Sequence, residues 1–234
     1  MVNNSRFMHT TNTLIISDIH LGSSVSRSKE LLHRLKSLTF ERLILNGDIF
    51  DDLNFTRLHH DDWALLTYLR ELSNPEKKVE LIWVVGNHDG PANTLSHLIG
   101  VPVRDEYAFE WYGKQCLVIH GHQFDRFLNK NIVISAVAST IYSLIQHIDT
   151  KQQFMSRFLK RASKSWLRIS KKVAHGAVRH AETENKDVVF CGHTHREMEL
   201  KIGRVEYYNS GCWTDIPSAY ITLKDGEIVI HKEK

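Results

Sequence analysis

Cysteine, proline and long apolar runs are all scarce in this chain of 234 residues. Its three cysteines, Cys116, Cys191 and Cys212, are odd in number and widely spaced, which excludes the framework of a small disulfide-stabilised protein. No apolar run reaches the roughly 18 residues of a membrane span; the longest candidate, residues 132–145, is interrupted by serine and threonine. The first eleven residues do not resemble a signal peptide. We therefore expect free thiols and a cytoplasmic protein.

A strong excess of charge is also missing. The formal net charge is +3, with 24% charged and 42% hydrophobic residues. This balance argues against a disordered chain and against a polycation that coats nucleic acid. The length allows one substantial hydrophobic core, so we predict a single domain over residues 1–234.

Short apolar runs, each ending at Gly, Asp, Asn or His, recur along the chain and predict buried strands. These runs cover residues 13–17, 42–45, 79–85, 115–119 and 188–191. Leucines at helical spacing predict helices over residues 28–38 and 61–72. Strands alternating with helices indicate an α/β protein. Three more strands, at 205–208, 219–223 and 227–231, are expected to be antiparallel, the last pair joined by a turn at Asp225-Gly226.

A helical insertion is predicted at about residues 126–186, where strand signals are missing. Between residues 151 and 180 there are nine Lys or Arg and no Asp or Glu. One stripe of this segment is apolar, comprising Phe154, Phe158, Ala162, Trp166, Ile169 and Val173. The neighbouring stripe is basic, comprising Arg157, Arg161, Lys164, Arg168 and Lys172. Such a surface suits lipid tails and anionic headgroups; packing of the apolar stripe on the core is the alternative.

Five polar motifs follow predicted strands directly. They are Asp18-Ile19-His20, Gly47-Asp48-Ile49-Phe50-Asp51, Gly86-Asn87-His88-Asp89, His120-Gly121-His122 and Gly192-His193-Thr194-His195. The carboxyl ends of strands are where ligands bind in open α/β sheets, so five such loops can meet at one point. Glycine beside a ligand allows the close backbone approach that a crowded site needs.

The side chains in these motifs indicate a metal site. Asp18 and His20 lie two residues apart on extended backbone and can chelate one ion, whereas His193 and His195 can bind the same ion or neighbouring ions. Imidazole and oxygen ligands without thiolate favour Mn, Fe, Zn, Ni or Co. An aspartate that bridges two ions, about 3.5–4 Å apart, is the arrangement that hydrolyses phosphate esters.

In this order and spacing, the five motifs resemble the calcineurin-like metallophosphoesterase superfamily over residues 13–223. The resemblance implies a four-layered αββα sandwich and two divalent ions, Mn foremost among them. By motif, Asp18, His20 and His195 would bind the first ion. The second would be bound by Asn87, His120 and His193, with Asp48 bridging both. His88 would act as proton donor to the leaving group, oriented by Asp51.

Within the superfamily, the chain looks most like the bacterial UDP-2,3-diacylglucosamine pyrophosphohydrolases of lipid A biosynthesis. The block at residues 120–125, the helical segment after it and the residues 208–213 carry this likeness. It implies a lipid-linked nucleotide as substrate, a lid made by the insertion, and peripheral contact with the inner membrane face. One position departs from that group: its best-characterised members have arginine where this chain has His88, a form shared with phosphodiesterases and phosphatases.

Two other functions remain as alternatives. One is hydrolysis of a different substrate, namely a nucleic acid, a cyclic nucleotide or a phosphoprotein. The basic segment could follow a phosphate backbone, but it lacks the interleaved aromatics of a strand-binding groove. The other is a binding scaffold without catalysis, which the presence of every family ligand disfavours.

Several further residues resemble site residues but have ordinary explanations. His59, His60, Asp61 and Asp62 precede a helix, where an aspartate is expected to cap. The tryptophans Trp63, Trp83 and Trp111 are expected in the core. Substrate contact and structural roles stay open for His122, Arg196, Asn209 and Trp213. Surface positions are expected for His97, His147, His175 and His180.

Overall fold

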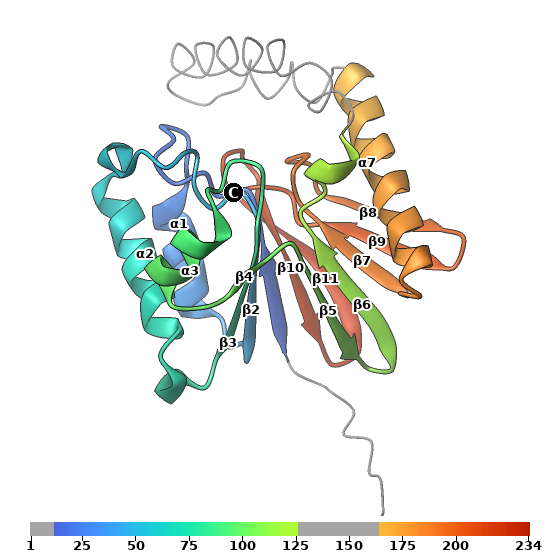
Figure 1. Ribbon diagram of the computed structural model, residues 1–234, viewed down its shortest axis with the longest axis horizontal. Helices are drawn as coiled ribbons and strands as arrows, with labels where there is room; N and C mark the ends of the chain where they lie inside the picture. The colour runs from blue at the N-terminus through green and yellow to red at the C-terminus, as the bar shows by residue number, and fades with distance from the viewer. Residues whose placement is uncertain (1–11, 126–163) are drawn as a thin grey trace, which may run out of the picture.

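A six-stranded mixed sheet is the first of two central layers in the computed structural model, which describes residues 12–125 and 164–234 (Figure 1). Its spatial order is β11, β10, β1, β2, β3, β4. The strands are Glu227–Glu233 (β11), Ser218–Lys224 (β10), Thr13–Ile16 (β1), Arg42–Asn46 (β2), Glu80–Val84 (β3) and Val103–Arg104 (β4). From β1 to β4 the strands are parallel, and β10 pairs antiparallel with both β1 and β11.

The second sheet has five strands in the order β5, β6, β7, β9, β8. The strands are Glu106–Trp111 (β5), Lys114–Ile119 (β6), Val188–Cys191 (β7), Val205–Asn209 (β9) and Met198–Ile202 (β8). The central strands β6, β7 and β9 are parallel, while β5 and β8 pair antiparallel at the two edges.

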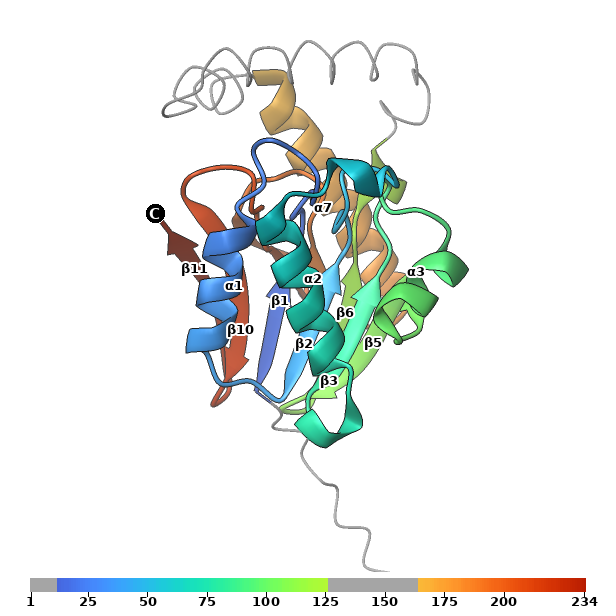
Figure 2. The same ribbon diagram turned by 90° about the vertical axis from the view of Figure 1, so that its left-hand side faces the viewer.

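Helices cover the outer faces of both sheets (Figures 1 and 2). Helices α1 (Ser28–Ser37), α2 (His60–Leu72) and α3 (Ala92–Ile99) lie on the first sheet, and α7 (Lys164–Thr183) lies on the second. Three single-turn helices, η1 (Phe55–Arg57), η2 (Pro75–Lys77) and η3 (His122–Phe124), are in connecting segments. The four layers confirm the predicted αββα sandwich. Within the described residues, no helix is both long and apolar enough to cross a bilayer.

The parallel strands are apolar at consecutive positions because both of their faces are buried. In β1, Leu14 and Ile16 pack toward the helices with Leu31, whereas Ile15 packs between the sheets with Val118. This alternation explains why five short apolar runs could be recognised as strands without a period of two.

A third core lies between the second sheet and α7. Ala174, Ala177 and Val178 of the helix are buried against Leu117 and Val189. Helix α7 falls within the segment predicted as an insertion, and its second half is an integral layer of the sandwich. Residues 126–163, which carry the first part of the predicted apolar and basic stripes, lie outside the described residues.

Some elements differ from the prediction. The Asp225-Gly226 turn is confirmed, with φ of 51° and 84°, and Trp83 and Trp111 are buried as expected. Trp63, expected in the core, is instead 48% exposed, because it lies outside the apolar stripe that Leu65 and Leu69 form on α2. The prediction missed β4, β5, β8 and α3. Edge strands β5 and β8 alternate partly buried and exposed residues, several of them charged, and so lack the continuous apolar run used to find strands.

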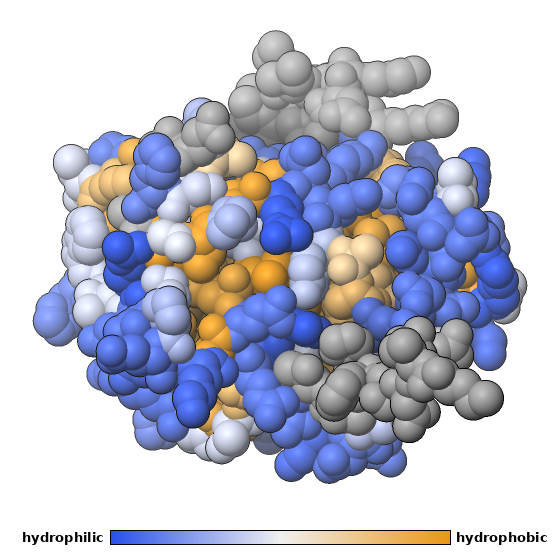
Figure 3. Space-filling view, turned by 60° about the horizontal axis from the view of Figure 1, so that its bottom comes forward, coloured by the Kyte–Doolittle hydropathy of each residue, from blue (hydrophilic) through white to orange (hydrophobic). Residues whose placement is uncertain are grey.

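At the end of the sandwich where β1 begins, apolar side chains emerge among hydrophilic ones (Figure 3). A shallow groove there is lined by Leu14, Leu38, Phe40 and Leu223 among other residues. Its described lining contains no histidine, cysteine or carboxylate. The groups that can bind a metal lie at the opposite end.

Candidate metal centre

Loops from both sheets meet at the carboxyl ends of their parallel strands. Three loops follow β1, β2 and β3 of the first sheet, and two follow β6 and β7 of the second. Hydrogen bonds join them across the sheets: Trp213 N donates to Asp18 O at 2.9 Å and His193 N to Asp18 Oδ2 at 3.0 Å. The meeting point is the edge at which α/β sheets bind ligands.

A first group of potential ligands consists of Asp18, His20 and His195, whose ligand atoms lie within 4.8 Å of one another. His195 Nε2 is 3.3 Å from Asp18 Oδ1 and 3.1 Å from His20 Nε2. All three were predicted to share one ion. The spacing of these atoms suits a single divalent cation in their midst.

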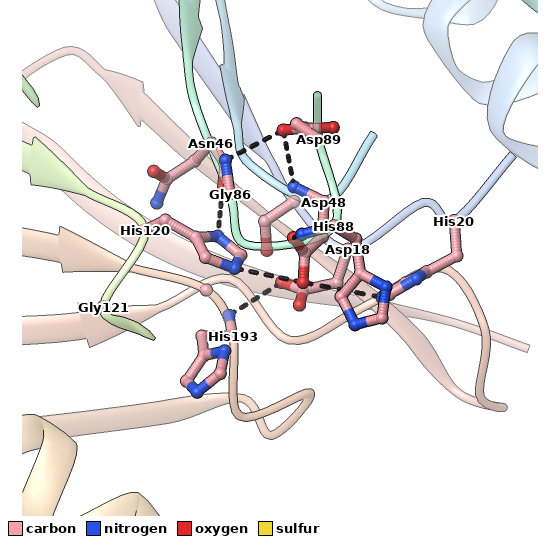
Figure 4. Close-up of polar contacts among 12 residues, drawn as sticks. Asp18, His20, Asn46, Asp48, Gly86, His88, Asp89, His120, Gly121 and His193 are labelled. Atoms are coloured by element: carbon pink, nitrogen blue, oxygen red, sulfur yellow. Dashed lines mark hydrogen bonds and ion pairs between the residues drawn. The ribbon is translucent and has the colours of Figure 1, made fainter. Parts of the chain in front are cut away.

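The second group consists of Asp48, His120 and His193, again with ligand atoms within 4.8 Å of one another (Figure 4). His120 Nε2 lies 3.2 Å from Asp48 Oδ2, and His20 Nε2 of the first group lies 3.8 Å from the same oxygen. Asp48 therefore stands between the two groups, which is the position that a bridging carboxylate requires.

Asn87, the seventh predicted ligand, is exposed in the loop after β3. Its neighbour His88 is tied to the centre, because His88 N donates to Asp48 Oδ1 at 2.8 Å. The loop that carries Asn87 thus contacts Asp48 of the second group through its backbone.

Every imidazole of the two groups has a hydrogen-bonding partner outside them. His120 Nδ1 contacts the Asn46 carbonyl oxygen at 2.8 Å, and His195 Nδ1 contacts Thr214 Oγ1 at 3.1 Å. The other two rings contact carboxylates: His20 Nδ1 lies 3.3 Å from Asp51 Oδ1, and His193 Nε2 lies 3.3 Å from Asp125 Oδ2. Outer partners of this kind fix ring orientation and strengthen the metal-binding nitrogen.

The backbone at the predicted ligands is strained. Nine non-glycine residues in the described parts of the chain have positive φ, and five of them are predicted ligands: Asp18, His20, Asp48, His193 and His195, with φ from 51° to 64°. Non-glycine residues rarely adopt this conformation, and such strain concentrates where function requires it.

The glycines of the motifs are needed for close packing. A Cβ on Gly86 would lie less than 3.0 Å from the Asp48 backbone nitrogen, and one on Gly192 less than 3.0 Å from Asp18 Oδ2. Gly47 would clash in the same way with the His120 ring. These contacts confirm that glycine permits the approach of neighbouring loops.

Asp89, the last residue of its motif, has a structural role that the sequence did not reveal. Its buried carboxylate accepts hydrogen bonds from the backbone nitrogens of Asp48, Ile49, Phe50 and Gly86 at 2.9–3.2 Å. It therefore holds the loop after β2 against the loop after β3. The place of Asp89 in the same motif, two residues after the predicted ligand Asn87, was the one available signal.

His88 and Asp51 meet, but through an atom other than expected. His88 Nδ1 contacts the Asp51 carbonyl oxygen at 2.9 Å. The Asp51 carboxylate lies against His20 and also accepts from Arg57 Nη2 at 2.8 Å. Asp51 therefore orients His88 through its backbone carbonyl, because its carboxylate contacts His20 instead.

Charges in the centre are strongly coupled. Burial opposes ionisation of Asp48, yet the neighbouring His120 holds its pKa well below the usual range. Burial also disfavours the charged form of His120, but Asp48 and Asp18 raise its pKa to about 10. Without a metal, these two residues form an imidazolium–carboxylate pair at neutral pH.

Two buried atoms indicate that the residues fit a metal. Asp18 Oδ1 and His120 Nε2 are buried and form no hydrogen bond of good geometry among the described residues, although each lies in an ion pair, with His195 Nε2 at 3.3 Å and Asp48 Oδ2 at 3.2 Å respectively. Coordination to a cation would satisfy the Asp18 oxygen, and would satisfy the His120 nitrogen once that ring has lost a proton. The donor set of carboxylates and imidazoles suits borderline divalent ions.

Two further groups adjoin the first, each with potential ligand atoms within 4.8 Å of one another: one consists of His20, Asp51 and His88, and the other of His195, Cys212 and Asp215. Cys212 is buried, and all three cysteines are free, as predicted. Neither Cys212 nor Asp215 was predicted as a ligand, although Cys212 lies within the segment 208–213 that carries part of the family likeness.

The four residues for which the sequence left both substrate contact and a structural role open differ in their burial. Asn209 and Trp213 are fully buried, and Asn209 Nδ2 donates to Gly192 O at 2.6 Å, so its role is structural. His122 is half-buried, and burial beside His120 and His193 lowers its pKa to about 4. Arg196 is also half-buried.

Asp62 caps the start of α2, but from the third position of the helix and not from before it as expected, because the N-cap residue is His59. Asp62 accepts from His59 N at 2.9 Å and from Gly22 N at 3.2 Å. Among the histidines expected at the surface, His97 and His175 are exposed and His180 contacts Glu106 at 2.8 Å. His147 lies outside the described residues.

The fold and site together define a protein of the metallophosphoesterase class: a four-layered sandwich with two carboxylate–imidazole groups at one edge. The sequence profile of the calcineurin-like phosphoesterase superfamily domain matches residues 12–223. The chain belongs to this superfamily.

Comparison with solved structures supports the same fold. An archaeal phosphodiesterase is 14% identical, with a TM-score of 0.53 over 94% of this chain and 99% of its own. Vps29 from Chaetomium thermophilum is 12% identical, with a TM-score of 0.50 over 95% of this chain and 96% of its own. A search of curated proteins found no match.

Proposed function

We propose that this chain is a dinuclear metal-dependent phosphoester hydrolase. The observation that carries the proposal is the pair of three-residue groups in one edge of the sandwich, with Asp48 between them. Six of the seven predicted ligands come from four separate loops into this space, and the seventh lies in an adjacent loop. Packing alone gives no reason for strained backbone at five of them.

The first ion would be held by Asp18, His20 and His195. The second would be held by His120, His193 and Asn87, with Asp48 shared between the two ions. A bound pair of divalent ions, which we propose to be Mn²⁺, supplies a water of lowered pKa and neutralises phosphoryl charge.

His88 is the proposed proton donor to the leaving group. A carbonyl oxygen can only accept, so the contact with Asp51 O places a hydrogen on His88 Nδ1. Because His88 is exposed, its Nε2 is then the atom that can exchange a proton with a substrate. Asp51 contributes through its carbonyl to His88 and through its carboxylate to His20.

The proposed substrate is a lipid-linked nucleotide such as UDP-2,3-diacylglucosamine. Two features support a ligand with both anionic and apolar parts. The outward face of α7 is basic, with exposed Arg168, Lys171 and Lys172, and its first turns lie at the site end of the sheets (Figure 1). Exposed apolar side chains, Leu53 and Trp63, follow the motif after β2. Peripheral contact with an anionic membrane surface is part of the same proposal.

The reaction class is tested with purified protein, added Mn²⁺ and bis-p-nitrophenyl phosphate. Turnover is expected with Mn²⁺ and should stop when a strong chelator is added. His88→Ala should keep both ions and lose about 10²–10⁴-fold in kcat. His97→Ala, an exposed histidine on α3, is the matched control and should behave like the wild type. Full turnover by His88→Ala would contradict the proton-donor role.

The substrate is tested by incubating the Mn²⁺-loaded protein with UDP-2,3-diacylglucosamine and measuring UMP release. Release of UMP supports the lipid-linked nucleotide. Turnover of a cyclic nucleotide, a nucleic acid or a phosphoprotein instead would move the assignment to that substrate. Two bound ions with no turnover on any of them would favour a binding scaffold.

A further inference from the structure

We propose that Asp125 is a positioning residue that sets the affinity of the second metal subsite, an inference that rests on the proposed metal centre. Its Oδ2 lies 3.3 Å from His193 Nε2. Both side chains are more than nine-tenths buried. The contact is therefore shielded from water, where electrostatic interactions are stronger than at an exposed surface.

An ionised carboxylate has no hydrogen to donate, so the contact requires the hydrogen on His193 Nε2. The other nitrogen, Nδ1, then keeps the lone pair that can bind a metal. The negative charge of Asp125 also makes that nitrogen a stronger donor. Loss of Asp125 would remove both the fixed tautomer and the added basicity.

The two subsites have matching outer partners. In the first group, His20 has the carboxylate of Asp51 and the other histidine has a threonine hydroxyl. In the second group, His193 has the carboxylate of Asp125 and the other histidine has a backbone carbonyl. Each ion would thus receive one imidazole backed by a negative charge. This arrangement predicts that each carboxylate acts on its own subsite.

Asp125 is held in place by the packing of η3 on α7. Asp125 N donates to His122 O at 3.1 Å, which closes the turn. Phe124 packs on Gly176 of α7 so closely that a Cβ on that glycine would lie less than 3.0 Å from the Phe124 ring. The position of the carboxylate therefore depends on the fit between one aromatic ring and one helical glycine.

Metal titration of Asp125→Ala and Asp125→Asn by isothermal calorimetry, with ions per chain counted by elemental analysis, tests the proposal. Mn²⁺ is the probe. Asp125→Ala should weaken the affinity for the ion of the second subsite by about 10–100-fold and leave the affinity for the other ion unchanged. Asp125→Asn, which still accepts a hydrogen bond, should lose less. Asp51→Asn is the matched variant and should instead weaken the affinity for the ion of the first subsite.

A second measurement reports the tautomer. Long-range ¹H–¹⁵N spectra of the metal-free protein, at a pH where His193 is neutral, should show its hydrogen on Nε2 in the wild type and a mixture of the two tautomers in Asp125→Ala. Thermal unfolding of the metal-free variants separates a folding defect from lost affinity. Wild-type affinity for both ions in Asp125→Ala, or a wild type that binds fewer than two ions, overturns the proposal. Two bound ions without phosphodiester hydrolysis would refute the proposed function and leave the role of Asp125 standing.

Discussion

At the residue scale, the histidines of the centre use their two ring nitrogens for different purposes. One nitrogen contacts an outer partner, such as Asn46 O for His120 or Thr214 Oγ1 for His195. The other nitrogen, Nε2 in both cases, faces a carboxylate of the centre. The outer partners fix the orientation of each ring, and a carbonyl oxygen such as Asn46 O also requires the hydrogen on the nitrogen that faces it, which leaves the other nitrogen as the one that can bind a metal.

The raised pKa of His120 predicts that metal affinity depends on pH. The pKa is about 10, so at neutral pH a proton must leave this ring before a metal can bind. The apparent affinity for Mn²⁺ should rise roughly tenfold per pH unit for each proton released, between about pH 6 and 8. The stability of the metal-free protein should change with pH in the opposite direction. The ion pair between His120 and Asp48 contributes its full stabilisation below the ordinary histidine pKa of 6.5, and this stabilisation is lost as the pH rises through about 10.

Calorimetric titrations in two buffers of different ionisation enthalpy measure this release directly. At least one proton should be liberated per pair of ions. An affinity that stays constant between about pH 6 and 8 would show that His120 is neutral in the metal-free protein.

The sequence identifies a residue of the site only where its role depends on residue type and local spacing. Metal ligands are recognised because their type and spacing serve chemistry, as with Asp18 and His20. Asp89, Asp125 and Thr214 act by touching a residue from a distant part of the chain: Asp125 is 68 positions from His193. No local pattern encodes such a partner.

At the element scale, helix α7 joins the fold to the site. Its apolar residues Val173 and Ala177 are buried, and its glycine, Gly176, receives Phe124 from η3. Glycine inside a helix costs about 1 kcal/mol relative to alanine, so its presence here needs a compensating contact. The close approach of Phe124 is that contact.

Gly176→Ala should therefore destabilise the protein by about 1–3 kcal/mol, although alanine favours the helix. In a Phe124→Ala background the same change should destabilise it less, because the clash with the ring is gone while the contact with the Cβ of residue 124, at 2.7 Å, remains. Urea unfolding of the four metal-free proteins gives the free energies of this cycle. Equal effects in both backgrounds would mean that the ring moves aside without cost.

The elements also show where periodicity is informative. Strands buried on both faces, such as β1 and β7, consist almost entirely of apolar residues and can be recognised in the sequence. Edge strands β5 and β8 have one partner strand each and alternate partly buried with exposed residues, so they went unpredicted. Their position in the sheet, rather than intrinsic preference, decides that they are extended.

At the scale of the whole molecule, the candidate centre contains residues from both sheets. Asp18, His20 and Asp48 come from the first sheet, and His120 and His193 come from the second. Ions held between them would add bonds across the sandwich that the unfolded chain cannot make. Metal binding should then act on global stability.

Saturating Mn²⁺ should raise the melting temperature. Free metal at a hundred times the Kd contributes about 2.7 kcal/mol, which corresponds to a rise of roughly 5–10 °C for a domain of this size. Differential scanning calorimetry of chelator-treated and Mn²⁺-loaded protein measures the change. Asp48→Ala should show little of it, since the residue between both groups is missing. The same rise in Asp48→Ala would place the stabilising metal elsewhere.

The sequence by itself determined the class of the fold and the chemistry of the centre, because both depend on local information. Buried strands need runs of apolar residues, and metals need particular side chains beside glycines at strand ends. Only the tertiary structure decided that the Asp51 carboxylate serves His20, that Asp89 joins two loops, and that Asp125 stands behind His193. These roles arise from contacts between segments far apart in the chain, and such contacts exist only once both sheets and α7 have packed.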